Sequence, residues 1–178
     1  MTNSYKSLDG SIRPLIEEVV DAELFDLEIS GLVEPGHGAA SGKSPRAKHP
    51  RGTLAMQYRY LLERGVDLGA FYTGTLNVSI APATYVIHRP WKRVDNVKWA
   101  ETVSSENFLL ARCCVGNSER TVCGLLYQPD PTTKTEHFDN PSHLQIIAPF
   151  LPNAGYGSHV SVYLVSAEVG ITRARSGE

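Results

Sequence analysis

The sequence has little that would direct the chain to a membrane or to a nucleic acid. Its net charge is −2 over 178 residues, so no strong field of one sign is present to attract nucleic acid. No apolar run approaches the roughly 20 residues that a transmembrane helix needs. The N-terminal stretch MTNSYKSLDG lacks the basic start and apolar segment of a secretory signal. We therefore expect a cytoplasmic protein without a nucleic-acid or membrane partner.

Cysteine is also scarce, with three residues in the whole chain, Cys113, Cys114 and Cys123. An odd number of cysteines without a secretory signal favours a reducing compartment. Cys113 and Cys114 are adjacent in an apolar run, which is not a usual spacing for metal ligands. We expect buried structural thiols rather than a zinc site or a nucleophile.

The common catalytic signatures are missing as well. The sequence contains no Walker A motif, no Gly-x-Ser-x-Gly elbow and no dinucleotide-binding fingerprint. The six histidines show no His-x-x-x-His pairing. Any chemistry must therefore be sought in less regular features.

Glycine and proline, in contrast, are frequent, with 15 and 11 residues, which favours many turns and a strand-rich fold. Residues 53–64 have a helical apolar stripe that ends at Gly65. We expect a mainly β fold, a β-barrel with one or two helices, formed by residues 24–166. Residues 1–23 are expected to be an extension with a short helix, and residues 167–178 a flexible tail.

Alternating or continuous apolar patterns predict the strands. A short helix or turn is predicted at residues 95–101, and strands are predicted at residues 24–32, 75–80, 84–88, 107–115, 121–128, 144–148 and 159–165. The second of these strands has the strictest alternation. Its polar face carries Thr75 and Asn77, whose neutral oxygens suit a hard cation such as Mg²⁺ that is already partly neutralised by phosphates. The alternative is that both side chains face water or bond to a neighbouring loop.

Two further segments have a functional and a structural interpretation. Residues 31–52 are rich in glycine and basic residues, so their backbone N–H groups suit a phosphate, but the segment also fits a solvated insertion. The cluster from Arg89 to Arg93 suits a ring or a phosphate, but it also fits a packed Trp91 with solvated neighbours. We leave both pairs of interpretations open.

Four segments in this order resemble the archaeal CTP-dependent riboflavin kinases: FDLEISGLVEPGHG at 25–38, GTLN at 74–77, LQIIAP at 144–149 and GSHVSVYL at 157–164. The resemblance implies a six-stranded cradle-loop barrel. It also implies transfer of phosphate, with Mg²⁺, from a CTP-like nucleoside triphosphate to riboflavin or a similar small alcohol. The residues implied are Thr75 and Asn77 for the metal, Gly31, Gly36, His37 and Gly38 for the nucleotide, and Thr133 or Thr135 with Gln145 for the flavin-like acceptor.

The chain departs from the family pattern in its glycine loop, which Val33-Glu34-Pro35 interrupts, and at residues 150–154, which are uncharged where the family is basic. Gln145 stands where the family has a glutamate, so a general-base role is lost there. Three functions therefore stay open: a phosphotransferase, a non-catalytic nucleotide- or flavin-binding barrel, and a barrel with a structural or interaction role. The sequence does not indicate an oligomeric state.

Overall fold

The computed structural model describes residues 24–36, 38, 40–42, 51–133 and 140–173. The predicted N-terminal helix, His37, Thr135, most of the basic loop and residues 174–178 lie outside the described residues. The elements in chain order are β1 (Leu27–Glu34), α1 (Thr53–Glu63), β2 (Leu76–Ser79), β3 (Thr84–Ile87), β4 (Lys92–Val97), β5 (Glu106–Gly116), β6 (Thr121–Pro129), β7 (His143–Ile147), β8 (His159–Leu164) and β9 (Val169–Thr172).

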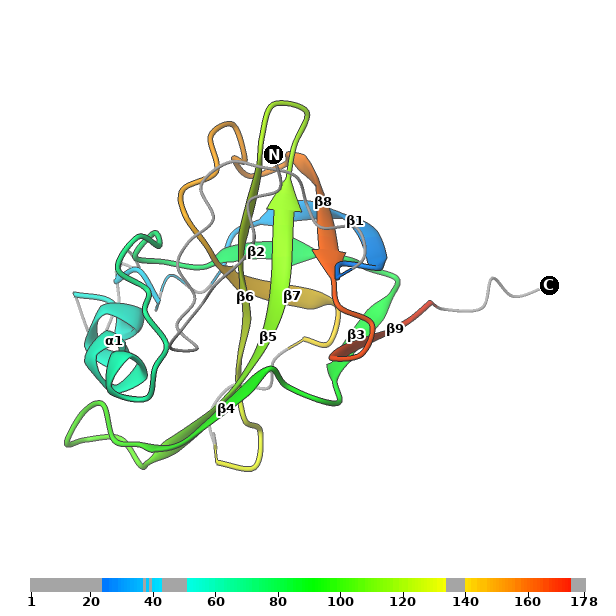
Figure 1. Ribbon diagram of the computed structural model, residues 1–178. Helices are drawn as coiled ribbons and strands as arrows, with labels where there is room; N and C mark the ends of the chain where they lie inside the picture. Colours follow the sequence, from blue (N-terminus) through cyan, green and yellow to red (C-terminus); the bar gives the residue numbers. More distant parts are fainter. Residues whose placement is uncertain (1–23, 37, 39, 43–50, 134–139, 174–178) are drawn as a thin grey trace, which may run out of the picture.

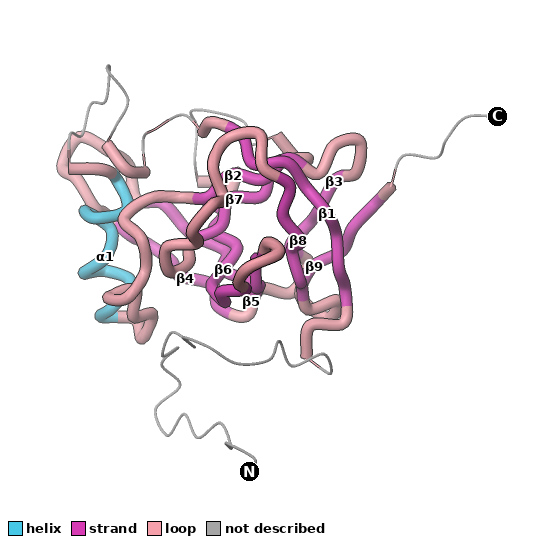
Figure 2. Tube along the Cα trace, turned by 90° about the horizontal axis from the view of Figure 1, so that it is seen from above, coloured by secondary structure: helices cyan, strands magenta, loops and turns pink. Residues whose placement is uncertain are grey.

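Seven of these strands form one antiparallel sheet in the order β4-β5-β6-β7-β2-β1-β8. Because β8 also pairs with β5, the strands β5, β6, β7, β2, β1 and β8 close into a ring of six (Figure 1). Figure 2 shows these strands arranged around a common centre. β3 and β9 form a separate two-stranded sheet. The prediction of a mainly β fold is therefore confirmed.

The inside of the ring is filled by one apolar core. Val33, Val78 and Leu144 lie in register across β1, β2 and β7, and each of them is buried. The alternation predicted for the second strand is confirmed, because Val78 and Ile80 are buried while Leu76 packs against the same core and is partly buried. The opposite side chains of β2 consequently point away from the ring.

A second core lies outside the ring, between α1 and the strands β4, β5 and β6. Leu54 and Leu61 of α1 belong to it together with Phe108 of β5 and Tyr127 of β6, whose rings stack at 5.2 Å between centroids. Both faces of β5 are therefore covered, which explains its nearly continuous apolar sequence. The Tyr127 hydroxyl donates a buried hydrogen bond of 2.7 Å to Gln57 Oε1 on the helix.

Two predicted segments are wrong. Residues 95–101 were expected to form a helix or turn, but residues up to Val97 belong to β4, whose pattern is broken by an irregularity between Val94 and Val97. Asn96 there has a φ of 55°. Val94 and Val97 are consequently both buried in the second core although they are three residues apart instead of two. The flexible tail was expected from residue 167, but Val169–Thr172 form β9, whose partner β3 is distant in sequence. Neither β4 nor β9 has a strong local signal in the sequence.

The cysteine prediction is wrong in part. Cys114 and Cys123 face each other directly across the β5–β6 hairpin and form a disulfide. Cys113 is the remaining free thiol, and its pKa is raised by burial, followed by the charge of Glu168. Disulfides are typical of oxidising compartments, so this pair does not support the reducing compartment that we expected.

In the part of the chain that the structure describes, no helix combines the length and apolar character needed to cross a membrane.

Candidate functional site

The outer surface of β1, β2 and β7 carries a group of polar side chains, which we call the polar face. Asn77 on β2 lies in register with Glu34 on β1 and with Gln145 on β7. Ser79, two residues along β2, lies in register with His143. Because paired residues on neighbouring strands point to the same side of a sheet, these five side chains share one face. All five are only partly buried, so ligands can reach them.

Thr75 and Asn77 lie against each other at one end of this face. The Asn77 Nδ2 atom donates to the Thr75 carbonyl at 3.3 Å and lies 3.4 Å from the Thr75 hydroxyl oxygen. A half-turn of the Asn77 amide would place Oδ1 beside the same hydroxyl and would break the hydrogen bond to the Thr75 carbonyl. The structure thus brings together the two side chains that the alternation placed on one face.

Gly36 adjoins the same pair. A methyl group placed on Gly36 would lie 2.3 Å from Asn77 Nδ2, so the backbone after β1 passes directly over the Asn77 side chain. Gly38, two residues further along, has a φ of 68°, which favours glycine. Of the glycines predicted to bind the nucleotide, Gly36 therefore lies beside Asn77.

Gly31 does not lie where a residue that binds the phosphates of a nucleotide would lie. It lies within β1 in register with Val160 of β8, and it is buried. A methyl group on Gly31 would lie 2.4 Å from Val78 Cγ1 and 2.7 Å from the Ser79 carbonyl oxygen. This corrects the assignment: Gly31 allows β1 to pack closely on β2 and is not a loop residue.

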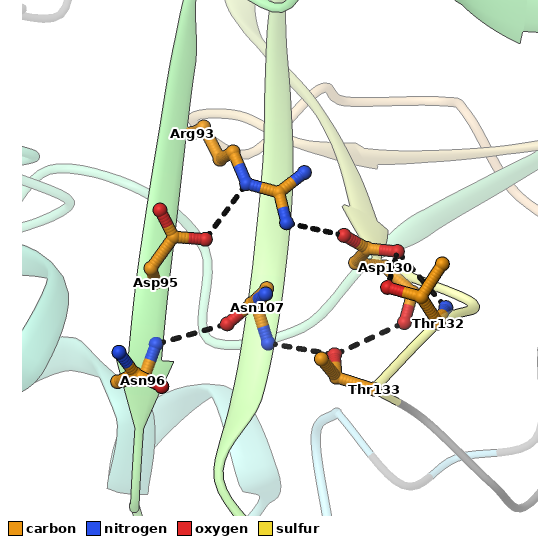
Figure 3. A network of polar contacts seen from close by, with 7 residues as sticks. All are labelled: Arg93, Asp95, Asn96, Asn107, Asp130, Thr132 and Thr133. Atoms are coloured by element: carbon orange, nitrogen blue, oxygen red, sulfur yellow. Dashed lines mark hydrogen bonds and ion pairs between the residues drawn. The ribbon is translucent and has the colours of Figure 1, made fainter.

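Of the predicted acceptor residues, the structure brings Gln145 to the polar face but holds Thr133 elsewhere. The Thr133 hydroxyl accepts a hydrogen bond from the Asn107 N–H at 2.9 Å and donates one to the Asp130 carbonyl at 3.1 Å (Figure 3). Asn107 belongs to β5, which lies on the opposite side of the ring from β2. Thr133 is therefore a turn-forming residue and does not meet Asn77.

The same turn accounts for part of the aromatic-basic cluster. The Arg93 guanidinium bonds to Asp95 and to Asp130, each at 2.7 Å, and so joins β4 to the end of β6 (Figure 3). Asp130 is buried and accepts further bonds from the Thr132 hydroxyl at 2.7 Å and the Thr132 N–H at 2.9 Å. The Thr132 hydrogen bonds, followed by Arg93, lower the pKa of Asp130. Two carboxylates thus hold Arg93 in a network that joins β4 to the turn after β6.

A cleft of about 210 Å³ opens beside Thr75. Its lining includes Leu76, Val115, Ile146 and Leu151, which close its inner end with apolar side chains. Three aromatic residues also line it, and their exposed fractions are 39% for Tyr72, 66% for Phe150 and 75% for Tyr156. The cleft is thus an apolar hollow at the edge of the polar face.

Sequence reasoning missed the three aromatic residues of the cleft. Tyr72 precedes β2, whereas Phe150 and Tyr156 belong to the segment between β7 and β8. The Tyr72 N–H donates to the Ala148 carbonyl at 2.9 Å, which brings the two segments together, and the Tyr72 and Phe150 rings lie 6.0 Å apart. The only signal in the sequence was negative, namely the uncharged stretch at residues 150–154.

A pair formed by His143 and Glu34 flanks the other end of the polar face. His143 Nε2 on β7 lies 2.9 Å from Glu34 Oε2 on β1, so the two side chains meet across β2. Both are about one-third exposed, at 35% and 36%. A ligand that lies along β2 and extends past Asn77 would contact this pair.

The donor set at Thr75 and Asn77 fits magnesium only together with phosphate oxygens. Among the described residues, no group of three or more His, Cys, Asp or Glu side chains is placed to hold a metal ion. Mg²⁺ keeps its waters unless carboxylates or phosphates replace them, and two neutral oxygens are insufficient. The pair is therefore suited to a magnesium–phosphate complex and not to a free ion.

A scan against models of protein families finds no match, and a search of curated proteins finds no significant similarity to this sequence. Function must consequently be inferred from the polar face and the cleft themselves.

Proposed function

We propose that this protein is a riboflavin kinase-like phosphotransferase built on a six-stranded cradle-loop barrel. In this proposal it transfers the terminal phosphate of a nucleoside triphosphate to riboflavin or a similar small alcohol, with Mg²⁺. The observation that carries the proposal is the meeting of Thr75, Asn77 and Gly36 at the mouth of an aromatic cleft. These parts come from separate segments of the chain and include the residues on which the family resemblance depends.

The arrangement matches what phosphoryl transfer requires. The reaction depends mainly on positioning the reacting groups and neutralising the phosphate charge, and it asks for little covalent chemistry from the protein. Thr75 and Asn77 would hold the magnesium ion, which would neutralise phosphate charge. The backbone at Gly36 passes over Asn77, where its peptide groups would lie close to a phosphate held by the magnesium ion.

The acceptor would lie on the polar face beyond Asn77. Gln145 is in register with Asn77, and its carboxamide has both a donor and an acceptor atom. The Glu34–His143 pair lies next to it across β2. Nucleotide and acceptor would then bind on the same strand, on the two sides of Asn77.

The second candidate is a barrel that binds a nucleotide or flavin without turnover. The observation that favours it is the uncharged Gln145, which cannot remove a proton from an acceptor hydroxyl. Binding through Thr75, Asn77 and the cleft would be the same in both cases. The two candidates differ only in whether a product forms.

Thermal unfolding with CTP, ATP, riboflavin and FMN, each with and without Mg²⁺, tests the proposal. A ligand at about 100 times its Kd adds about 2.7 kcal/mol to the stability of the folded state, which raises Tm by about 5–10 °C in a chain of this size. We expect a nucleotide to raise Tm only when Mg²⁺ is present. Incubation of the protein with nucleotide, Mg²⁺ and riboflavin should then yield FMN, detected by chromatography.

The outcomes separate the candidates. Magnesium-dependent nucleotide binding with FMN formation supports the phosphotransferase. Binding without a phosphorylated product supports the non-catalytic barrel, and no shift with any of these ligands contradicts both.

A further inference from the structure

We infer that the cleft beside Thr75 receives the base of the nucleotide by stacking and does not distinguish one base from another. This inference rests on the proposed function and deepens it. It differs from the family resemblance, which implies a preference for CTP. Three properties of the cleft support the inference: its size, its lining and its position relative to Asn77.

The size of the cleft limits what it can hold. Its volume is about 210 Å³. Pockets for whole drug-sized ligands are usually about 300–1,000 Å³, so this cleft suits a single ring system. The ribose and phosphates of a nucleotide must therefore lie outside it.

The position of Thr75 indicates where the ribose and phosphates of the nucleotide would lie. Thr75 both lines the cleft and lies 3.4 Å from the Asn77 side chain. Asn77 lies two residues further along β2, or roughly 7 Å at the usual rise of a strand. A base in the cleft would consequently place its phosphates along the outer surface of β2, beside Gly36 and Asn77.

The lining favours a flat ring. Tyr72, Phe150 and Tyr156 present their rings beside apolar side chains, and the last two are mostly exposed, at 66% and 75%. Exposed apolar groups gathered in one place usually mark a binding site. Stacking of a nucleic-acid base on an aromatic side chain is favourable, and it tolerates any base because every base has a π-face.

The lining also has few side-chain groups that could identify a base. Among the described residues, no charged side chain lines the cleft, and only Thr75 and the two tyrosines bring polar side chains to it. Strong discrimination between similar ligands requires buried hydrogen-bonding groups that the wrong ligand leaves unpaired. Stacking alone gives no such penalty, so we expect the four common nucleotides to bind with Kd values within about tenfold of one another.

Isothermal titration of the full chain with CTP, UTP, ATP and GTP, each with Mg²⁺, measures this directly. Inorganic tripolyphosphate with Mg²⁺ is the probe without a base, and it should bind more weakly than any of the four. Methyl resonances of Val115 and Leu151, which line the cleft, should shift with every nucleotide and stay in place with tripolyphosphate. These resonances place the base in the cleft independently of affinity.

Phe150→Ala and Tyr156→Ala test the contribution of stacking. Both side chains are exposed, so their removal should leave the fold intact. Each change should weaken all four nucleotides by about tenfold, with the same factor for each base, and leave tripolyphosphate binding unchanged. Leu62→Ala is the matched control, because Leu62 is 45% exposed on α1, which contributes no residue to the cleft.

Two results would overturn the inference while leaving the proposed function in place. One is a difference of more than about 100-fold between bases, which would show direct recognition of the base. The other is magnesium-dependent nucleotide binding that neither aromatic substitution weakens. If neither nucleotides nor tripolyphosphate bind at all, the proposed function fails, and this inference fails with it.

Discussion

The two halves of the six-stranded ring differ in what covers their outer faces. On the side of β5 and β6, α1 and β4 cover the ring, and polar groups there are paired within the protein, as in the bonds of Tyr127 to Gln57 and of Asp130 to Arg93. On the side of β1, β2 and β7, the outer face carries Asn77 and its polar neighbours, which are partly exposed. The same ring thus has one flank suited to stability and another suited to ligands.

The sequences of the strands reflect this difference. A strand covered on both faces has apolar residues at nearly every position, as β5 does, whereas a strand covered on one face alternates, as β2 does. Substitutions on the covered flank should therefore change stability, and substitutions on the polar face should change binding. Four experiments test this difference between the two flanks.

The largest effect is expected from Phe108→Ala on the covered flank. Phe108 is fully buried in the second core and stacks on Tyr127. Removing a buried phenyl ring costs about 3–5 kcal/mol of the free energy of unfolding, through lost burial and the cavity left behind. Chemical denaturation measures it, with Val86→Ala as a control that should change stability by less than about 0.5 kcal/mol, since Val86 is 56% exposed. A Phe108→Ala protein as stable as this control would contradict a closed second core.

A smaller effect is expected from Asp130→Asn. At neutral pH the loss of hydrogen bonds to a buried carboxylate should cost about 1.5–3 kcal/mol. Because the pKa of Asp130 is lowered in the folded protein, its carboxylate stabilises the fold above the ordinary aspartate pKa, and this contribution is lost as pH falls through the folded-state pKa. The gap in stability between wild type and Asp130→Asn should therefore be constant from pH 5 to 8 and shrink below about pH 4.

Denaturation curves across this pH range give the measurement. Asp95→Asn removes the other carboxylate that contacts Arg93, but that carboxylate is half exposed, at 50%, so the change should cost less than about 1 kcal/mol. A gap that grows as the solution is acidified would show that the network does not favour ionised Asp130.

Two of the three glycines predicted to bind the nucleotide, Gly31 and Gly36, provide the third experiment. Gly31→Ala forces a methyl group against Val78 and the backbone of Ser79, and overpacking of this kind costs about 1–3 kcal/mol. Gly36→Ala meets only the end of the Asn77 side chain, which can move, so stability should change by less than about 0.5 kcal/mol. Nucleotide binding should be weakened more by Gly36→Ala than by Gly31→Ala, because Gly36→Ala displaces Asn77. Equal effects of the two substitutions on both properties would remove the distinction between them.

The sequence predicted those features that depend on local patterns. The helix at residues 53–64, the β5–β6 hairpin and the two faces of β2 follow from periodicity within single segments, and so does the contact of Thr75 with Asn77. The irregularity in β4 hides its alternation, and β9 is a strand only because β3, far away in sequence, pairs with it.

The rest of the site depends on which segments meet, and a single sequence does not specify this. Gly31 and Gly36 look alike in a glycine-rich stretch, and only the pairing of β1 with β2 and β8 separates their roles. Thr133 seemed equivalent to other loop threonines until its bond to Asn107 placed it across the ring. The aromatic cleft combines residues on either side of β2 and β7, so no single stretch displays it.

The smallest effect on stability, and the sharpest on function, is expected from Asn77→Ala. The side chain is on the partly exposed polar face, and its only hydrogen bonds among the described residues are long contacts to Thr75, at 3.3 and 3.4 Å. Stability should therefore change by less than about 0.5 kcal/mol. Binding should weaken, because Asn77→Ala removes one of the two protein oxygens that would hold the magnesium ion beside the phosphates. We expect that Mg²⁺ will no longer increase nucleotide affinity.

Ser79→Ala, on the same strand and face, is the control that should keep this dependence. An Asn77→Ala protein that unfolds, or that binds nucleotide with unchanged magnesium dependence, would show that Asn77 supports the structure and that the polar face is not the magnesium–phosphate site.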